Sequence, residues 1–528
     1  MESIATVIIL LAVVTALAEV TDRIRIPYPI LLVLSGIGIG LIPGLPAISL
    51  SPDVVFLIFL PPILYSAAWN TSWPDFKAAK RPITLLAIGC VIFTTCAVAW
   101  IAHIFIPNVG WPEAFVLGAI ISPPDAIAAT ASTKGLNVPK RIITVLEGES
   151  LVNDATGLIA YRYAVAAVVT GVFSIWDAGI QFILVATGGI IVGLIMAWVF
   201  KWIHKITPDN PTTDTTLTFI TPFIVYLMAE SIHLSGVLAV VSCGLYLSWH
   251  ASEIFSHQTR LQAYGSWGTA IFVLNGVVFI LIGLQLPMIL DSIEGHSFVM
   301  LLKYGAIVSL AVIAGRILWV YPGAYIPRLS RKIREAEPEV NLKLVTIVAW
   351  SGMRGVVSLA AALAIPLMIE GSQPFPNRNL IIFLTFSVIF STLVVQGLTL
   401  RPLIKWLGIK PDGKAHEQEL NARLSVASAV IEHIEENYSL DLTDEGLNLI
   451  KTKYEIRIQR IRKGETIQNV QAVLVDKLPV IQQELLNKER ELILKLRKEG
   501  SISAEALRKI EYELDLEETR LILEKGIL

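Results

Sequence analysis

Long apolar stretches with few ionisable side chains fill the first 410 residues, and this pattern constrains the fold more than any other feature of the chain. Only 45 of the 86 Asp, Glu, Lys and Arg residues lie there, between runs of about 20 apolar residues, the length at which a helix spans a bilayer. Over the whole chain 16% of residues are charged, against about a quarter in soluble domains. We therefore expect an all-α polytopic membrane protein.

Thirteen membrane spans are predicted, the eighth and ninth of them short and close together. Their centres lie near residues 11, 36, 60, 93, 121, 156, 190, 224, 242, 277, 314, 356 and 391. With this count the basic residues gather in alternate loops, and the positive-inside rule places those loops in the cytoplasm. The prediction is a multi-pass plasma membrane protein, of the bacterial inner membrane type, with its N-terminus outside and its C-terminus inside.

The last part of the chain has a different composition. Residues 411–528 carry dense Glu, Lys and Arg with Leu and Ile at helical spacing, which predicts a helical cytoplasmic tail after a transmembrane domain over residues 1–410. The net charge of −2 gives no indication of nucleic acid binding, and the three cysteines (Cys90, Cys96, Cys243) show neither a disulfide framework nor metal-ligand spacing. We expect no cofactor.

Two of the predicted spans are interrupted in their middle. In the fifth, Pro123 and Pro124 cannot continue the backbone hydrogen bonds of a helix, and Asp125 follows them. In the twelfth, glycines flank the buried Arg354. Free backbone groups at membrane depth are tolerated where they line a cavity or are buried in protein. We therefore expect broken helices whose ends face an ion.

The sixth span carries a ladder of polar side chains. At 100° per residue, Glu149, Ser150, Asn153 and Asp154 lie within an arc of about 140° on one helix face. Carboxylate and hydroxyl oxygens suit a hard monovalent cation, and a carboxylate can exchange that cation for a proton. Arg354 needs a counter-ion, for which Glu149 is the available acid, and Arg316 is a second candidate partner for an acid.

The positions of the breaks indicate an internal repeat. If spans 1–6 and 8–13 are repeats joined by span 7, each break is fifth in its repeat, and the odd linker inverts the second repeat. Inverted repeats with broken helices at the midplane are typical of secondary transporters. A channel and a membrane enzyme remain alternatives, although the sequence shows neither a repeated carbonyl-rich filter loop nor a Gly-x-Ser-x-Gly or His-Glu-x-x-His motif.

Three motifs together resemble the monovalent cation:proton antiporter-1 family, in particular its bacterial sodium/proton exchangers. They are Ser122-Pro-Pro-Asp125-Ala-Ile-Ala-Ala, Glu147-Gly-Glu-Ser-Leu-Val-Asn-Asp154-Ala-Thr-Gly and Gly352-Met-Arg-Gly-Val-Val-Ser-Leu-Ala. The resemblance covers residues 1–410. It implies a core domain that moves against a dimerisation domain in a homodimer, and a role in pH homeostasis. One departure is visible, because many exchangers have proline where Ala126 follows the first aspartate.

The resemblance also implies roles for single residues. Asp154 would bind either the cation or the proton, with Asn153 beside it where electrogenic relatives carry an aspartate. Ser150 and the backbone of Pro124 would complete the coordination, and Asp125 would orient the broken helix and face the ion. Glu149 would be held by Arg354. A bound Na⁺ would thus contact Asp154, Asp125 and Ser150.

Charge counting then predicts the stoichiometry. If Glu149 is neutralised and Asn153 is uncharged, Asp154 alone titrates, so one cation exchanges for one proton. We expect Na⁺, with Li⁺ as a further substrate, and keep exchange of K⁺ or of both cations as the alternative, because selectivity depends on cavity size and ligand number.

Overall fold

The computed structural model describes residues 11–17, 19, 26–42, 52–133, 136, 138–207, 210–291, 293, 297–336, 340–369, 373–409 and 413–438, and shorter stretches of the remainder. It divides into two compact units, Met1–Pro411 and Asp412–Leu528. Helices dominate both, and within the described residues the one extended pairing is an isolated bridge between Met368 and Pro374. The expected all-α class is confirmed.

In the first unit, residues 11–17 are helical at the first predicted centre, and named helical segments cover the other twelve. They are α2 (Tyr28–Gly40), α3 (Pro52–Val54) continuing through η1 (Val55–Phe59) into α4 (Leu60–Asn70), α5 (Trp73–Ala78), α6 (Lys80–Thr84) continuing through η2 (Leu85–Cys90) into α7 (Val91–Phe105), α8 (Trp111–Ile121), α9 (Ala126–Thr133), α10 (Lys140–Thr170), α11 (Ile175–Ile206), α12 (Pro211–Ser231), α13 (Gly236–Trp249), α14 (Ala251–Ile254), α15 (His257–Asp291), α16 (Phe298–Tyr325), η3 (Ile326–Leu329), α17 (Arg331–Ala336), α18 (Leu342–Trp350), α19 (Val356–Leu363) and α20 (Arg378–Leu407).

Six of the described helical segments are long and apolar enough to cross a membrane by themselves. Others, including α2, α8 and α13, are apolar but shorter. The two crowded spans are separate helices, since α12 ends at Ser231 and α13 begins at Gly236 after a turn. The count of thirteen spans and their inverted repeat stay predictions.

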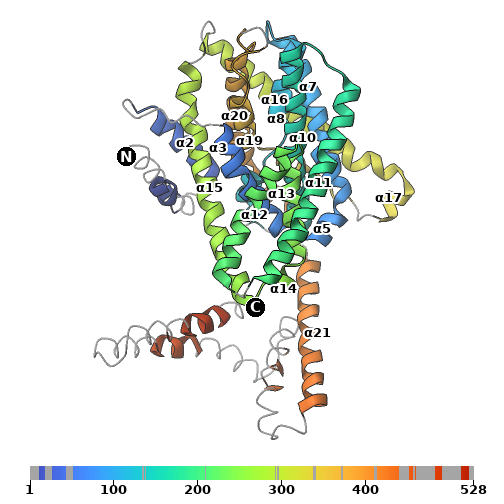
Figure 1. The fold of residues 1–528 in the computed structure, drawn as a ribbon, viewed down its shortest axis with the longest axis vertical. Helices are drawn as coiled ribbons and strands as arrows, with labels where there is room; N and C mark the ends of the chain where they lie inside the picture. The colour runs from blue at the N-terminus through green and yellow to red at the C-terminus, as the bar shows by residue number, and fades with distance from the viewer. Residues whose placement is uncertain are drawn as a thin grey trace. The chain divides into compact units, whose positions relative to one another are not determined.

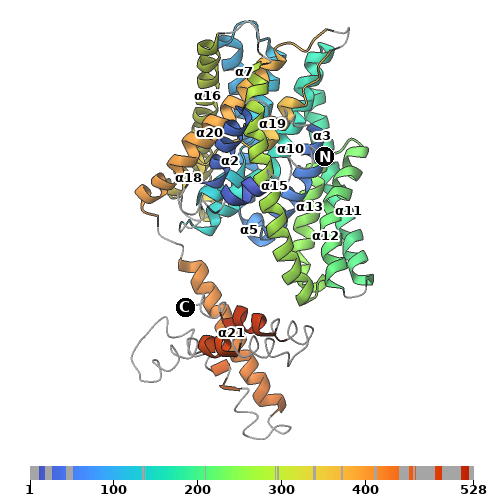
Figure 2. The ribbon, with the colours of Figure 1, turned by 90° about the vertical axis from the view of Figure 1, so that its left-hand side faces the viewer.

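The helices of the first unit form two groups with α10 between them. In Figure 2, α16, α18 and α20 lie on one side and α11, α12 and α13 on the other, while α10 and α19 lie between. Leu151 and Ala155 of α10 pack with α4 and α11–α13, whereas Leu146 and Tyr161 of the same helix belong to the larger cluster around α7, α8, α16 and α20. Helix α10 therefore presents different faces to two different surroundings.

Helix α2 packs backbone to backbone against part of the longer α15 (Figure 1). A Cβ added to Gly36 would collide with the Ile280 carbonyl, and one added to Gly283 would collide with the Val33 carbonyl. Close approach at small residues is a common way for membrane helices to associate, because lipid tails offer no hydrophobic drive.

Both predicted interruptions are present. Residues Ser122–Asp125 separate α8 from α9, and Ser351–Gly355 separate α18 from α19. Proline explains the first break, because Pro123 and Pro124 lack the N–H groups that a continuous helix needs. We call α8, α9, α18 and α19 the half-helices.

The second unit begins with α21 (Gly413–Tyr438). Farther along, the described residues 482–489 and 513–521 are helical. Leu486, Leu514 and Leu521 form a small buried cluster with Ile510, and Gln483 donates to Glu518 at 2.8 Å. These described stretches are helical, and the cytoplasmic tail over residues 411–528 stays a prediction.

Candidate functional site

The two breaks cross each other at the centre of the first unit. The Asp125 N–H donates to the Met353 carbonyl at 2.7 Å, which joins one break directly to the other. The Asp125 carboxylate accepts from the Ile127 N–H at 2.8 Å and so caps the start of α9. Any side chain at position 355 would collide with this carboxylate, so the crossing requires Gly355.

Arginine side chains cap the C-terminal ends of all four half-helices. These ends leave backbone carbonyls without helical partners and carry partial negative charge. The guanidinium bonds run from Arg354 to Ile121 (2.8 Å) and Ser122 (3.1 Å) at α8, from Arg401 to Ser132 (3.1 Å) at α9, from Arg316 to Val348 (3.2 Å) at α18, and from Arg378 to Leu363 (3.0 Å) and Ile365 (2.9 Å) at α19. The broken backbone is thus satisfied by fixed positive charge.

Helix α10 divides its polar side chains between two faces. Glu149 and Asn153, one turn apart, point into protein and form what we call the core stripe. Ser150 and Asp154, also one turn apart, line a cavity and form the cavity stripe. The predicted single face therefore corresponds to two neighbouring stripes about 100° apart.

The core stripe is held by direct bonds. Glu149 and Arg316 form a two-pronged ion pair with oxygen–nitrogen distances of 2.6 and 2.8 Å, and both side chains are buried. The Asn153 amide donates to the Pro124 carbonyl at 2.7 Å. Asn153 is fully buried and does not line the cavity. We infer that Asn153 holds the first break in place.

Our expectation that Arg354 is the partner of Glu149 is wrong. Arg354 is buried, but its guanidinium bonds to the carbonyls of Ile121, Ser122 and Gly352, and among the described residues it forms no ion pair with a carboxylate. The physical reason is local, because the broken end of α8 supplies several carbonyls in reach of one planar group. Arg316 takes the acid instead.

The cavity stripe opens onto a cavity of about 560 Å³. Its walls come from α2, α4, α9, α10, α15 and α19, and the acidic residues among them are Asp125, Glu147 and Asp154. Asp154 has 8% of its surface exposed and forms no ion pair with a described residue. A buried carboxylate without a fixed counter-ion is costly, and a cation or a proton offsets that cost.

The structure brings together most of the residues singled out in the sequence. Asp154, Asp125 and Ser150 line one cavity, whereas at the first break it is Pro123 rather than Pro124 that lines it. Further polar residues of the wall were missed because nothing in their local pattern distinguishes them from helix residues in general; they are Tyr28, Ser66, Asn70, Thr130, Thr133, Asn275 and Ser358.

Comparison with known proteins places this geometry in a family. Residues 8–406 match the family described as "Sodium/hydrogen exchanger, transmembrane". The chain belongs to this family. The match confirms the resemblance drawn from the three motifs, and it makes the chain a multi-pass membrane protein of the sodium/proton antiporter type.

Relatives extend the match over nearly the whole exchanger. A sodium, potassium, lithium and rubidium/H⁺ antiporter of Bacillus pumilus is 33% identical over 479 residues, which cover 88% of this chain and 70% of the relative. An uncharacterized Na⁺/H⁺ exchanger of Mycobacterium tuberculosis is 33% identical over 551 residues, covering 98% and 96% of the two chains.

A solved structure shares the fold. The sodium proton antiporter MjNhaP1 of Methanocaldococcus jannaschii matches with a TM-score of 0.61 at 20% sequence identity, over 78% of this exchanger and 100% of that chain.

Proposed function

We propose that this exchanger carries Na⁺ in one direction and a proton in the other, one for one, by alternating access, with Asp154 as the group that holds either ion. The observation that carries the proposal is the buried Asp154 carboxylate, which faces a cavity and has no ion pair among the described residues. Ser150 and Asp125 line the same cavity and supply further oxygens for the cation. The proposal needs neither a cofactor nor covalent chemistry.

The one-for-one ratio is supported by the fixed charges around the site. Glu149 and Arg316 cancel each other as an ion pair. Asn153, beside Asp154, carries no charge. We take Asp154 as the one group that titrates during the cycle, and its charge is neutralised equally well by a sodium ion or a proton. Each half-cycle therefore moves a neutral site.

Alternating access is supported by the shape of the cavity. Its lining runs along α10 from Asp154 through Glu147 to Ile143, toward the end of the helix that carries Lys140. By the positive-inside rule that end is cytoplasmic, so the arrangement is inward-facing. On the opposite half of α10, Arg162 bonds to Glu230 of α12 at 2.6 Å and so joins α10 to the group of α11, α12 and α13.

We infer that the Arg162–Glu230 pair helps to hold the outer side closed. Because Arg162 is half exposed, the pair contributes at most about 1 kcal/mol. Glu230→Gln is expected to shift molecules toward the outward-facing form and to weaken apparent cation binding from the inner face by up to about fivefold, the ratio that corresponds to 1 kcal/mol. Lys201, paired with Glu253 at 3.1 Å, offers the control Glu253→Gln. Equal inner affinities in both variants and the parent would contradict the role of the Arg162–Glu230 pair.

A broader cation range is the second candidate, since the Bacillus pumilus relative is described as using potassium, lithium and rubidium as well as sodium. The two cation ranges can be distinguished in proteoliposomes with an acid interior, where a pH-sensitive dye reports the loss of the proton gradient after each salt is added. Sodium or lithium should dissipate the gradient, and dissipation by potassium at similar concentration would favour the broader range. A reversal point that moves with an imposed membrane potential would contradict the one-for-one ratio.

The proposal also includes the orientation and assembly expected from the sequence. The exchanger should lie in a bacterial inner membrane with its N-terminus outside and its C-terminus in the cytoplasm. It should be a homodimer. Labelling of single cysteines introduced near each terminus tests the first, and the mass of the detergent-solubilised protein by light scattering tests the second.

A further inference from the structure

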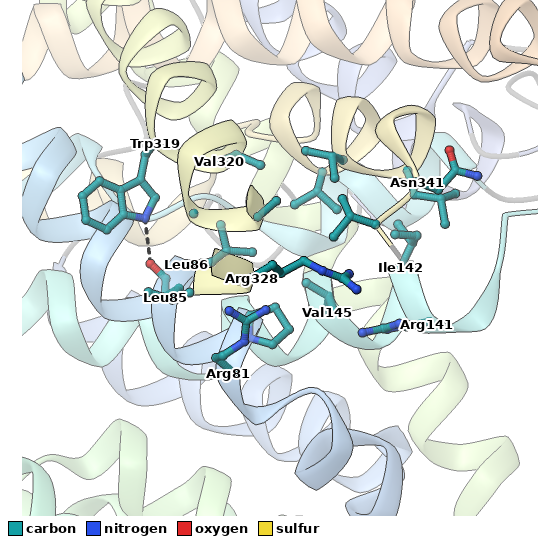
Figure 3. A pocket seen from close by; sticks show the side chains of 17 residues that line it. Arg81, Leu85, Leu86, Arg141, Ile142, Val145, Trp319, Val320, Arg328 and Asn341 are labelled. Carbon is teal, nitrogen blue, oxygen red and sulfur yellow. Dashed lines mark hydrogen bonds between the residues drawn. The ribbon is translucent and has the colours of Figure 1, made fainter. Parts of the chain in front are cut away.

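A second pocket, separate from the cation cavity, lies among α6, η2, α10, α16 and α18 (Figure 3). It has a volume of about 140 Å³ and lies at the end of the helices where the basic loops are. The apolar residues of its wall include Leu86 of η2, Val145 of α10, Val320 of α16 and Leu344 of α18. None of the residues proposed to bind the cation lines it.

Three arginines line this apolar pocket. They are Arg81, Arg141 and Arg328, and no acidic side chain is among the lining residues that the structure describes. Figure 3 shows Arg328 extending across the pocket toward the side where Arg141 and Asn341 lie. The neighbouring Lys140 is paired with Asp75 at 3.0 Å, but Arg141 forms no ion pair with a described residue. The pocket therefore concentrates positive charge beside apolar walls.

The apolar wall is built to persist. Trp319 of α16 donates its indole N–H to the Leu85 carbonyl at 2.9 Å and packs against Phe93 with ring centres 5.2 Å apart. The carbonyl lies in the π-helical turn η2, just after Pro82, where the regular hydrogen-bond pattern of the helix is interrupted. Trp319 thus fixes α16 against η2 and keeps the wall in place.

We propose that this pocket binds an anionic phospholipid of the cytoplasmic leaflet, with its phosphate at Arg141 and Arg328 and the upper part of an acyl chain against the apolar wall. Guanidinium groups match phosphate oxygens in two-pronged geometry. Basic pockets between membrane helices at the cytoplasmic side suit acidic headgroups. A free phosphate ion would use the arginines but leave the apolar wall without a partner, so the combination favours a lipid.

A lipid bound in this pocket should stabilise the region where the two helix breaks cross. Val145 lies one turn before Glu149 on α10, and the carbonyl of Val348, another wall residue, accepts the Arg316 Nε bond at 3.2 Å. A lipid in the pocket therefore contacts the residues next to the Glu149–Arg316 pair. We expect bound anionic lipid to stabilise the fold, by linkage between binding and unfolding.

The test uses the full-length exchanger, delipidated in detergent and examined by native mass spectrometry and thermal unfolding. Phosphatidylglycerol, phosphatidylcholine and inorganic phosphate are added separately. We expect phosphatidylglycerol to bind and to raise the unfolding temperature, with at least tenfold weaker binding of phosphatidylcholine and little effect of phosphate. Equal binding of the two lipids would overturn the charge-based site, and a phosphate effect as large as that of phosphatidylglycerol would indicate a soluble anion instead.

Two sets of variants locate the lipid. Arg141→Gln with Arg328→Gln should reduce phosphatidylglycerol binding at least tenfold, whereas Arg331→Gln with Arg334→Gln, in the neighbouring exposed α17, should not. Ala324→Leu fills the apolar side while leaving the arginines and should also reduce binding. If the double arginine variant does not fold, binding of phosphatidylglycerol to Ala324→Leu still tests the site. Unchanged lipid binding in either folded variant would refute the assignment.

Discussion

The core stripe and the cavity stripe of α10 have different surroundings, although their residues are adjacent in the sequence. In the core stripe, Glu149 is bonded to Arg316 and Asn153 to the Pro124 carbonyl. In the cavity stripe, Asp154 faces open space without an ion pair among the described residues. The comparison teaches that polarity inside a membrane protein does not by itself indicate a site, because the bonds to neighbours decide whether a group supports the fold or binds an ion.

The largest expected effect comes from Asp154. Asp154→Asn removes the buried carboxylate that is proposed to hold either ion, so cation-driven proton movement should fall at least a hundredfold. The fold should remain, because the amide replaces a buried charge that has no ion-pair partner in the described structure. Flux in proteoliposomes measures the loss of transport, and thermal unfolding in detergent checks that the fold is kept. Retained flux would place the ion elsewhere.

The second largest effect is expected at Glu149, where a substitution should lower stability. Glu149→Gln leaves Arg316 buried without its counter-charge and should lower the free energy of unfolding by about 3–5 kcal/mol. Thermal or denaturant unfolding in detergent measures this loss. Arg331 forms an exposed pair with Glu335 at 2.7 Å, so Glu335→Gln is the matched control and should have little effect. A stable Glu149→Gln variant that has lost transport would move Glu149 into the ion chemistry.

Asn153 should give a smaller effect of the same kind. Asn153→Ala removes the donor to the Pro124 carbonyl, and a buried carbonyl without a partner costs about 1–3 kcal/mol. Because the bond positions the first break, the maximal exchange rate should also fall. If only the apparent affinity for the cation changes, Asn153 is a ligand rather than a positioning residue.

Ser150 should show the smallest effect. Ser150→Ala removes one cavity oxygen but leaves Asp154 and Asp125, so the apparent affinity for sodium should weaken about fivefold, which corresponds to about 1 kcal/mol. The free energy of unfolding should change less than in Asn153→Ala. A destabilisation like that of Asn153→Ala would place Ser150 with the core stripe and dissolve the distinction between the two stripes.

Much of this could be predicted from the sequence, and the failures have physical causes. The breaks followed from Pro123 and Pro124 and from the glycines around Arg354, since these residues act on their own backbone. The partner of Glu149 could not be predicted, because Arg316 and Arg354 are both far away in sequence and both buried. Helical geometry placed four polar residues within one arc but could not tell that two different surfaces meet along it.

Long-range bonding also explains why the arginine caps were missed. Arg401 and Arg378 lie near the ends of α20 and resemble ordinary loop or helix-end residues in the sequence. Their roles depend on Ser132 and Leu363, which only the folded chain brings within reach. A basic residue that follows a broken span is therefore worth testing as a cap in other transporters.

The choice of arginine for these caps has a consequence for how the exchanger responds to acidity. A guanidinium group keeps its proton throughout the physiological range, so the four half-helix ends remain bonded whether the cell interior is acid or alkaline. Histidine in the same places would loosen or tighten the crossing as it titrated. The frame around the ion is thus constant while its contents change, and the acidity dependence of transport should reflect ion competition at the site instead of a loosening of the fold.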